Sequence, residues 1–339
     1  MGFSIPAILF LCRHVRIENR SIRPLNIKIQ IRLILTVKID YNERKNKKRI
    51  DAMEGLIIKG IAGFYYVRTT EGVLECKARG IFRKMNLTPM VGDRVTVDNN
   101  SQGNTIDKIH ERTSELVRPF VANVSQAYVV FALRNPNINF DLLNKFIVSL
   151  EKNGIRPVLV FNKCDLAKEN EKDTLKEIFI GTGYDIYFIE AKTGIGLELL
   201  FEKLKGNITV LCGPSGSGKS TLLNKLSGKE HMETGEISKR LNRGKHTTRH
   251  SELIEVNESF LVDTPGFSTM EFSMEPEELK DYFPEFNDYD GLCRFNGCNH
   301  NKEPGCRVKE EVGPSISKTR YDFYVKYYNE LIEEKKNKW

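Results

Sequence analysis

The chain has 339 residues, of which 40% are apolar and 29% charged, an ordinary globular composition with room for two or three domains. No apolar run approaches the length that a membrane-spanning helix needs, and Phe3–Cys12 lacks the basic flank of a signal peptide. The composition therefore argues against a membrane protein and against secretion, and we expect a cytoplasmic protein with no membrane partner.

The net charge of +7 is concentrated at the N-terminus. Residues 1–52 carry twelve Lys or Arg against four Asp or Glu, so the remainder of the chain carries −1. Bulk charge therefore does not indicate that the folded body binds nucleic acid. The segment 1–52 is predicted to be a disordered basic extension or an upstream extension of the reading frame. The alternative is an arm that contacts RNA or a membrane surface.

Residues 53–118 are predicted to form a small β-barrel. β-branched and aromatic residues alternate there with polar ones, Gly or Asn-Asn interrupts the runs, and there is no period of helix length. The expected strands are Gly55–Ile58, Gly63–Arg68, Gly72–Arg79 and Val91–Val97. An oligonucleotide-binding barrel is one common form, but such barrels host many functions, so the fold alone supports RNA binding only weakly.

Residues 122–272 are predicted to form an α/β domain, because apolar strands alternate with helical segments. The expected strands are Ala127–Leu133, Pro157–Phe161, Asp185–Ile189, Ile208–Cys212, Glu252–Val256 and Phe260–Val262. Phe140–Asn153 has apolar residues at helical spacing, and Gly154 is its stop signal. The pattern indicates a parallel sheet whose strands are buried.

The eight residues Gly213–Ser220 fit the phosphate-loop pattern G-x-x-x-x-G-K-[ST], between an apolar strand and a helical run. Backbone N–H groups of such a loop point at phosphate oxygens, and a glycine-rich turn is the alternative. Lys219 is expected to reach the β- and γ-phosphates, and Ser220 to ligate Mg²⁺. The predicted phosphate-binding residues are Gly213, Pro214, Ser215, Gly216, Ser217, Gly218, Lys219, Ser220 and Thr221.

Asn162-Lys163-Cys164-Asp165, at the end of an apolar strand, predicts that the nucleotide is GTP or GDP. The Asp165 carboxylate can accept both N1–H and N2–H₂ of guanine, whereas adenine offers no donor pair at that edge. Asn162 and the stem of Lys163 are expected to hold the loops around the base. Ala191 and Lys192 are expected to complete the base pocket, through a backbone N–H and a lysine stem.

The residues that respond to the γ-phosphate are expected in two segments. After an apolar strand, Asp263 is expected to hold the Mg²⁺ shell, and the Gly266 N–H to reach the γ-phosphate. Thr248, in the polar stretch 244–249, is expected to complete the Mg²⁺ coordination when the γ-phosphate is present.

A glutamine that orients the attacking water follows this motif in many GTPases, but here the position is Phe267. The predicted catalytic residues are therefore His246, Lys219 and Thr248, and a solvated loop histidine is the alternative for His246. Turnover is expected to be slow until a partner orders the switch.

Cys293, Cys298 and Cys306 cluster around His300, while the other four cysteines are scattered, which suits a reducing, cytosolic protein. Three thiolates and one imidazole suit a closed, structural Zn²⁺ site; reduced cysteines packed in a loop are the alternative. This loop lacks a core of its own, so we expect metal to be the main stabiliser of the 273–339 module.

The tail 315–339 is predicted to be helical. Tyr321, Tyr324, Tyr328 and Leu331 lie on one stripe of that helix. We interpret the stripe as core packing or docking onto a neighbouring domain, rather than as a base-stacking surface.

The base-recognition motif precedes the phosphate loop, the reverse of the usual order, and the site survives if the old termini are joined and new ones opened. These motifs, the barrel, Gly244–Thr248 and the cysteine cluster resemble the ribosome small subunit-dependent GTPase A family, the circularly permuted GTPases. The resemblance begins at Met53 and excludes residues 1–52, and Glu190 departs from the usual Ser-Ala-Lys.

The resemblance implies an OB-like β-barrel, a circularly permuted P-loop GTPase domain and a C-terminal zinc-binding module with helices. It also implies GTP/GDP, Mg²⁺ and one structural Zn²⁺ as cofactors, with zinc on Cys293, Cys298, His300 and Cys306. The expected activity is that of a bacterial GTPase that binds the small ribosomal subunit and its rRNA, is activated by it, and acts late in its maturation.

Two other functions stay open on the sequence, and we expect a monomer in each case. One is a nucleotide-switched RNA-binding module in which hydrolysis is incidental. The other is an ATP-using kinase or ATPase, against which Asp165 argues. Stimulation of turnover by small subunits separates the enzyme from the binding module.

Overall fold

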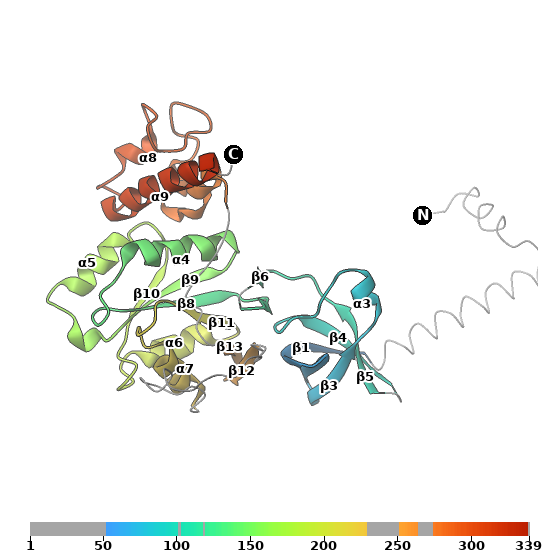
Figure 1. Cartoon of the computed structure of the whole chain (residues 1–339). Coiled ribbons are helices and arrows are strands. Elements are labelled where there is room, and N and C mark those ends of the chain that lie inside the picture. The colour runs from blue at the N-terminus through green and yellow to red at the C-terminus, as the bar shows by residue number, and fades with distance from the viewer. Residues whose placement is uncertain (1–51, 101–102, 118, 229–250, 264–273, 338–339) are drawn as a thin grey trace, which may run out of the picture. The chain divides into compact units, whose positions relative to one another are not determined.

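The computed structural model describes residues 52–337 apart from 101–102, 118, 229–250 and 264–273 (Figure 1). The chain divides into two units, Met1–Ala52 and Met53–Trp339. The predicted basic extension therefore lies almost wholly outside the described residues. None of the helices that are described is long and apolar enough to cross a membrane.

Five strands form the predicted barrel: β1 (Ala52–Ile61), β2 (Phe64–Thr69), β3 (Gly72–Ala78), β4 (Arg94–Asn100) and β5 (Gly103–Ile109). Their order is β1-β2-β3-β5-β4, and an additional β1–β4 pairing closes the barrel. The inward side chains of Ile57, Val67, Val95, Val97 and Ile106 are fully buried.

Two barrel elements were missing from the sequence prediction, β5 and the single-turn helix α3 (Ile81–Lys84). β5 has one fully buried side chain, Ile106, among polar and exposed ones, so its hydrophobic signal is weak. Its pairing partners are β3 and β4, and the β3 pairing is parallel. Beyond the barrel, the short strands β6 (Glu115–Leu116) and β7 (Val121–Ala122) pair with each other on the way to the next domain.

The α/β domain is built on six further strands: β8 (Gln126–Ala132), β9 (Arg156–Asn162), β10 (Asp185–Phe188), β11 (Ile208–Cys212), β12 (Glu252–Val256) and β13 (Ser259–Asp263). Their spatial order is β10-β9-β8-β11-β13-β12. Numbered from β11 as the first strand, this order reads 6-5-4-1-3-2. The sheet is therefore continuous in space although the chain enters it at β8.

The prediction of a parallel sheet is wrong for β12, which runs antiparallel to β13. The two strands are joined by Asn257 and Glu258, whose φ angles are +45° and +60°. Positive φ at both central residues is the conformation of the tight hairpin turn that suits twisted strands. This turn therefore sets the antiparallel direction of β12, although the alternation of strands and helices predicted a parallel strand.

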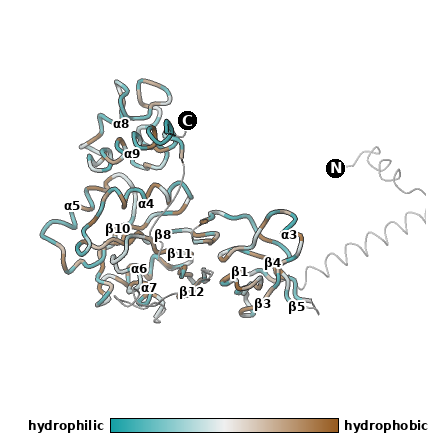
Figure 2. Tube along the Cα trace, viewed as in Figure 1, coloured by the Kyte–Doolittle hydropathy of each residue, from teal (hydrophilic) through white to brown (hydrophobic). Residues whose placement is uncertain are grey.

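Helices cover both faces of this sheet: α4 (Phe140–Lys152) and α5 (Glu171–Ile178) one face, α6 (Leu197–Leu204) and α7 (Lys219–Ser227) the other (Figure 1). Alternate residues of a strand point to opposite faces. Accordingly Phe131 packs in the cluster that contains α4 side chains, and Val130 in the one that contains α6 and α7 side chains. Figure 2 shows the strands as mainly hydrophobic.

The C-terminal module consists of the 3₁₀ helices η4 (Pro276–Tyr282) and η5 (Pro284–Tyr289) and the α-helices α8 (Arg307–Glu310) and α9 (Lys318–Asn337). Tyr324 and Leu331 are buried and Tyr321 and Tyr328 half-buried, so the α9 stripe is core packing, as predicted. α9 and η4 also contact α4 of the α/β domain.

The expectation that the cysteine loop lacks a core has to be corrected. Cys298 and Cys306 are buried in a cluster with Phe283, Phe286 and Tyr324. The sequence around the cysteines is polar, but the aromatic residues that cover it come from η5, from Phe283 directly before it, and from α9, which lie before and after the loop along the chain.

Candidate nucleotide and metal sites

The predicted phosphate loop joins β11 to α7 and requires glycine at two positions. A Cβ atom on Gly213, whose φ is +133°, would lie 2.1 Å from the Val130 carbonyl oxygen. A Cβ atom on Gly218, whose φ is +97°, would lie 2.1 Å from Asn162 Nδ2. The loop is therefore packed against the ends of β8 and β9. The first turn of α7 carries no acidic residue, so the positive end of its dipole is uncompensated.

The side chain of Lys219 is held by backbone carbonyl oxygens of this loop. Its ammonium donates hydrogen bonds to the carbonyl oxygens of Gly213, at 2.8 Å, and Pro214, at 2.7 Å. Burial lowers the pKa of Lys219, because a desolvated ammonium is disfavoured. Ser220 and Thr221 follow in the first turn of α7 and are half-buried.

Asn162 ties the two predicted halves of the site together. Its side chain is almost wholly buried at the end of β9. Nδ2 donates to the Ser217 carbonyl oxygen at 2.8 Å, and Oδ1 accepts from the Ala191 N–H at 3.0 Å. One amide therefore connects the phosphate loop to both loops that were predicted to surround the base.

Lys163 makes a second connection that the sequence predicted only in part. The residue has a left-handed backbone, and its ammonium donates to the Gly216 carbonyl oxygen at 3.0 Å and to that of Asn135. Asn135 was not predicted as a site residue, and Pro136 beside it packs against Gly216. The available signal was the position of these residues just after β8, since neighbouring parallel strands end at the same edge of a sheet.

The other predicted base-pocket residues lie around the side-chain amide of Asn162. Ala191 is buried, whereas Lys192 and Asp165 are exposed, and Asp165 is in the 3₁₀ turn η2 (Cys164–Leu166). The Cys164 N–H donates to the Ile189 carbonyl oxygen at 3.1 Å, which holds the two base loops side by side. The carboxylate that was predicted to read guanine is therefore in contact with solvent.

The predicted Mg²⁺ residues are only partly described. Asp263 ends β13, whose Val262 pairs with Val210 on the parallel strand β11, so Asp263 and the start of the phosphate loop share one sheet edge. A carboxylate there and the Ser220 hydroxyl at the start of α7 are the hard oxygen donors that Mg²⁺ prefers. His246, Thr248, Gly266 and Phe267 lie outside the described residues.

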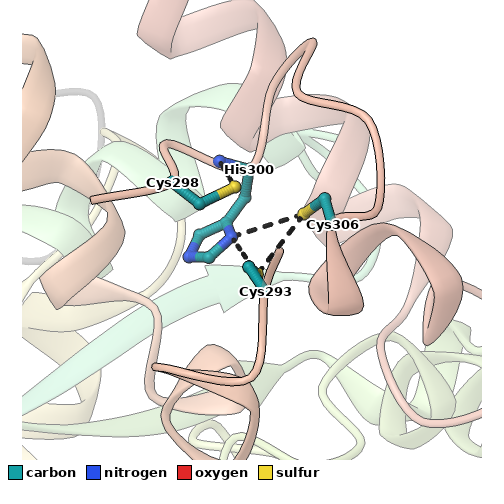
Figure 3. A group of neighbouring side chains, drawn as sticks. All are labelled: Cys293, Cys298, His300 and Cys306. Carbon is teal, nitrogen blue, oxygen red and sulfur yellow. Dashed lines mark hydrogen bonds between the residues drawn. The ribbon is translucent and has the colours of Figure 1, made fainter. Parts of the chain in front are cut away.

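The predicted zinc ligands converge, as Figure 3 shows. The ligand atoms of Cys293, Cys298, His300 and Cys306 all lie within 4.8 Å of one another. His300 Nδ1 is 3.6 Å from Cys293 Sγ and 3.4 Å from Cys306 Sγ, and these two sulfur atoms are 3.9 Å apart.

Three of the four ligand atoms, those of Cys293, His300 and Cys306, have the spacings of a tetrahedral zinc site. Zn–S bonds of about 2.3 Å and a Zn–N bond of about 2.0 Å at tetrahedral angles separate two sulfurs by about 3.8 Å, and sulfur from nitrogen by about 3.5 Å. Burial lowers the pKa of His300, which favours the neutral ring, the form that binds a metal. The backbone N–H groups of His300 and Arg307 point at Cys298 and Cys293 Sγ, at 3.4 and 3.3 Å.

The loop that carries these ligands is braced by α9. The Tyr321 hydroxyl donates to the His300 carbonyl oxygen at 2.8 Å, and the Tyr324 hydroxyl donates to that of Asn299 at 2.5 Å. The rings of His300 and Phe286 pack edge to face, with centroids 5.6 Å apart. The four ligands are thus held by the module's aromatic core as well as by one another.

Comparison with known proteins agrees with this arrangement. Residues 54–106 match the family described as the RsgA N-terminal domain, and residues 109–273 match the RsgA GTPase family. The chain is 58% identical over 287 residues to the small ribosomal subunit biogenesis GTPase RsgA of Clostridium perfringens, covering 84% of this chain and 100% of that one. The protein of the same name from Clostridium beijerinckii is 58% identical over 290 residues, or 85% and 100% of the two chains.

Two crystal structures are similar as well. YloQ, described as a circularly permuted GTPase, has a TM-score of 0.71 at 38% identity and covers 83% of this chain and 96% of its own. YjeQ from Thermotoga maritima has the same score, identity and coverage of this chain, with 99% of its own chain covered. The motifs, the permuted sheet and these matches together show that the chain belongs to the RsgA family of circularly permuted GTPases.

Proposed function

We propose that this protein hydrolyses GTP, binds the small ribosomal subunit, acts late in the maturation of that subunit and is stimulated by it. The observation that carries the proposal is the double hydrogen bond of Asn162, which joins the phosphate loop at Ser217 to the base loop at Ala191. The relatives from two Clostridium species support the subunit as partner, because both are named small ribosomal subunit biogenesis GTPases and match over their whole length.

Within this proposal each site residue has a role. Asp165 accepts the guanine donors, and Lys219 stabilises the phosphate charge that develops during hydrolysis. Mg²⁺, when bound, neutralises phosphate charge, and its ligand set would be the hydroxyls of Ser220 and Thr248, with the Asp263 carboxylate in the surrounding shell. Gly266 offers an N–H to the γ-phosphate.

His246 is proposed as the residue that orients the attacking water, since Phe267 has no group that could do so. The test is kcat of His246→Ala, measured with and without small subunits. The proposal requires a large loss of the stimulated rate, by about 100-fold or more. An unchanged stimulated rate would remove His246 from the mechanism.

The remaining proposals concern organisation. We divide the chain at 1–52, 53–118, 122–272 and 273–339, and the strand and helix bounds given above support this division. One structural Zn²⁺ per chain is supported by the dimensions of the Cys₃His cluster. A family named for ribosome biogenesis favours the cytoplasm, and we propose that the protein acts there as a monomer.

The deciding experiment measures GTP turnover of the full chain, with and without purified small ribosomal subunits, and with large subunits as the control. We expect small subunits alone to raise turnover by orders of magnitude, as activators do for other GTPases. Binding without stimulation would favour a nucleotide-switched RNA-binding module instead. In the same assay Asp165→Asn should lose GTP turnover and gain turnover of xanthosine triphosphate, whose base offers an acceptor where guanine has a donor.

A further inference from the structure

The barrel and the nucleotide site share one row of opposed residues. Lys59 on β1 is the Cα partner of Glu252 on β12, and Glu252 is the Cα partner of Asp263 on β13. Directly opposed residues of antiparallel strands point to the same face and are close enough to interact. The row therefore leads from a barrel lysine, through one glutamate, to the carboxylate that we propose for the Mg²⁺ shell.

This row carries one positive charge, on Lys59, followed by two negative charges, on Glu252 and Asp263. The Lys59 ammonium lies 2.7 Å from Glu252 Oε2. Without Lys59, Glu252 and Asp263 would be like charges on directly opposed residues, an unfavourable arrangement. Lys59 thus offsets a negative charge that would otherwise add to the field at Asp263.

A second ion pair also joins the barrel to β12, but from β2 rather than β1, and it does not reach Asp263. Arg68 on β2 makes a bidentate contact with Glu255. Its Nε donates to Oε2 at 3.0 Å, and its Nη2 donates to Oε1 at 3.2 Å. The partner of Glu255 across the hairpin is Phe260, not a charged residue. The chain therefore provides two barrel ion pairs on β12, of which one lies beside the carboxylate proposed for the Mg²⁺ shell.

The backbone contact between β1 and β12 is short. Lys59 and Glu252 are the one pair in register among the described residues of these strands. Directly beyond them, Gly60 and Ser251 border a pocket of about 220 Å³, to which Phe64 and Phe120 also contribute. Contact between barrel and hairpin at this point thus relies on the ion pairs as much as on strand pairing.

We propose that Lys59 and Glu252 are positioning residues of the GTPase centre, which set the affinity of the Asp263 site for Mg²⁺ according to whether the barrel is docked. With the barrel docked, Lys59 neutralises Glu252 and Mg²⁺ is held less tightly; with the ion pair open, the charge of Glu252 strengthens the attraction. By linkage, Mg²⁺ binding must weaken the docking of the barrel by the same factor. A partner that binds the barrel and changes its docking therefore also changes the affinity of the nucleotide site for Mg²⁺.

The test measures the Mg²⁺ concentration needed to slow dissociation of a fluorescent GDP from the full chain, a readout that needs no turnover. Lys59→Met should lower that concentration about 3-fold to 10-fold at low salt, and Glu252→Gln should raise it by a similar factor. The double variant should return close to the parent value, and 0.5 M salt should shrink both shifts. Loss of docking alone would move both single variants in the same direction, and that outcome, or no shift, overturns the proposal.

The matched control is the other ion pair. Arg68→Met and Glu255→Gln remove an ion pair between the barrel and β12 but leave the row to Asp263 intact, so any shift of the Mg²⁺ dependence that they cause through weaker docking should have the same direction in both. Opposite shifts in these two variants, as large as those of Lys59→Met and Glu252→Gln, count against the proposal. The inference rests on the proposed role of Asp263, which Asp263→Asn tests separately. If that variant binds Mg²⁺ as well as the parent, the proposed role fails; if it binds Mg²⁺ weakly while the Lys59 and Glu252 variants do not shift oppositely, only this inference fails.

Discussion

Asn162 Nδ2 donates a hydrogen bond of 2.8 Å to the carbonyl oxygen of Ser217, which lies 55 residues further along the chain. Because the same side chain also accepts from Ala191, the amide fixes three loops relative to one another. The base loops precede the phosphate loop along the chain, and this buried side chain joins them in space.

Asn162→Ala is expected to weaken GTP and GDP binding alike, because both nucleotides need the same spacing of base and phosphate loops. Two buried hydrogen bonds at about 0.5–1.5 kcal/mol each correspond to a loss of about 10-fold to 100-fold in affinity. The measurement is the Kd of fluorescent GDP and GTP analogues at a fixed Mg²⁺ concentration. A loss confined to GTP would assign Asn162 to the γ-phosphate response instead.

Asn139→Ala is the control for this variant. Asn139 caps α4 by accepting from the Leu142 N–H at 3.0 Å, so its loss should cost about 1 kcal/mol of stability. It has no bond to the phosphate or base loops among those described, and nucleotide affinity should stay at the parent value. Comparing the two variants separates loss of stability from loss of the site.

As the pH is raised, nucleotide affinity should begin to fall at a lower pH than it would if Lys219 had the pKa of an ordinary lysine. Burial lowers the pKa of Lys219, and phosphate prefers the protonated ammonium. Affinity should therefore be full below the lowered pKa and fall as the pH rises through it. Titration of the Kd for GDP from neutral to alkaline pH measures this decline.

Guanine itself loses a proton in alkali, so Lys219→Arg is the necessary comparison. Arginine stays charged throughout, so its variant should bind more weakly at neutral pH but show a smaller alkaline decline. If the parent and the arginine variant decline in parallel, the base rather than Lys219 accounts for the pH dependence.

Charged residues that the sequence placed in no motif turn out to hold the C-terminal module in place. Arg320 on α9 is fully buried and binds both carboxylate oxygens of Glu285, at 2.7 and 3.1 Å. It also donates to Asn144 Oδ1 on α4, at 2.6 Å. Arg320→Met should destabilise the protein by about 3–5 kcal/mol, because it leaves a buried carboxylate without its partner. Urea denaturation measures the change.

Two further variants make this prediction specific. Arg320→Met combined with Glu285→Leu should recover much of the lost stability, because no uncompensated charge stays buried. Lys318→Ala breaks an exposed pair with Asp322 on the same helix and should change stability by less than about 1 kcal/mol. If the double variant is no more stable than Arg320→Met, the cost arises from packing rather than from charge.

The sequence names candidate residues for the site, but it does not show the contacts that join its parts. The phosphate loop, the base motif and the zinc ligands could be recognised because each is a short pattern of residues whose types and spacing its chemistry requires. The Lys163 contact with Asn135 was not, since a backbone carbonyl oxygen leaves no mark on residue identity. Arg320 was missed for a related reason: a single arginine in a charged helix has the pattern of a solvated residue.

The fold, too, was predicted where a local pattern indicates the structure and missed where it depends on other features. Strands with continuous apolar runs, such as β8 and β11, were predicted closely because burial on both faces requires that pattern. The direction of β12 was not, because it depends on two residues with positive φ, neither of them glycine. The core around the cysteines was missed because its aromatic residues lie outside the loop that they cover.

Removal of zinc is therefore expected to loosen the loop and to leave α9 folded, rather than to unfold the whole module. The carbonyl oxygens of Asn299 and His300 are bound by Tyr324 and Tyr321, and most side chains of that core are not metal ligands. With a strong chelator, the three thiols should become reactive while the helical circular dichroism changes little. Tyr324→Phe keeps the ring but deletes its bond to Asn299, so after chelation its thiols should react faster than those of the parent. If chelation abolishes the signal of α9, metal is the main stabiliser after all; if the tyrosine variant reacts at the parent rate, the hydroxyl does not brace the loop.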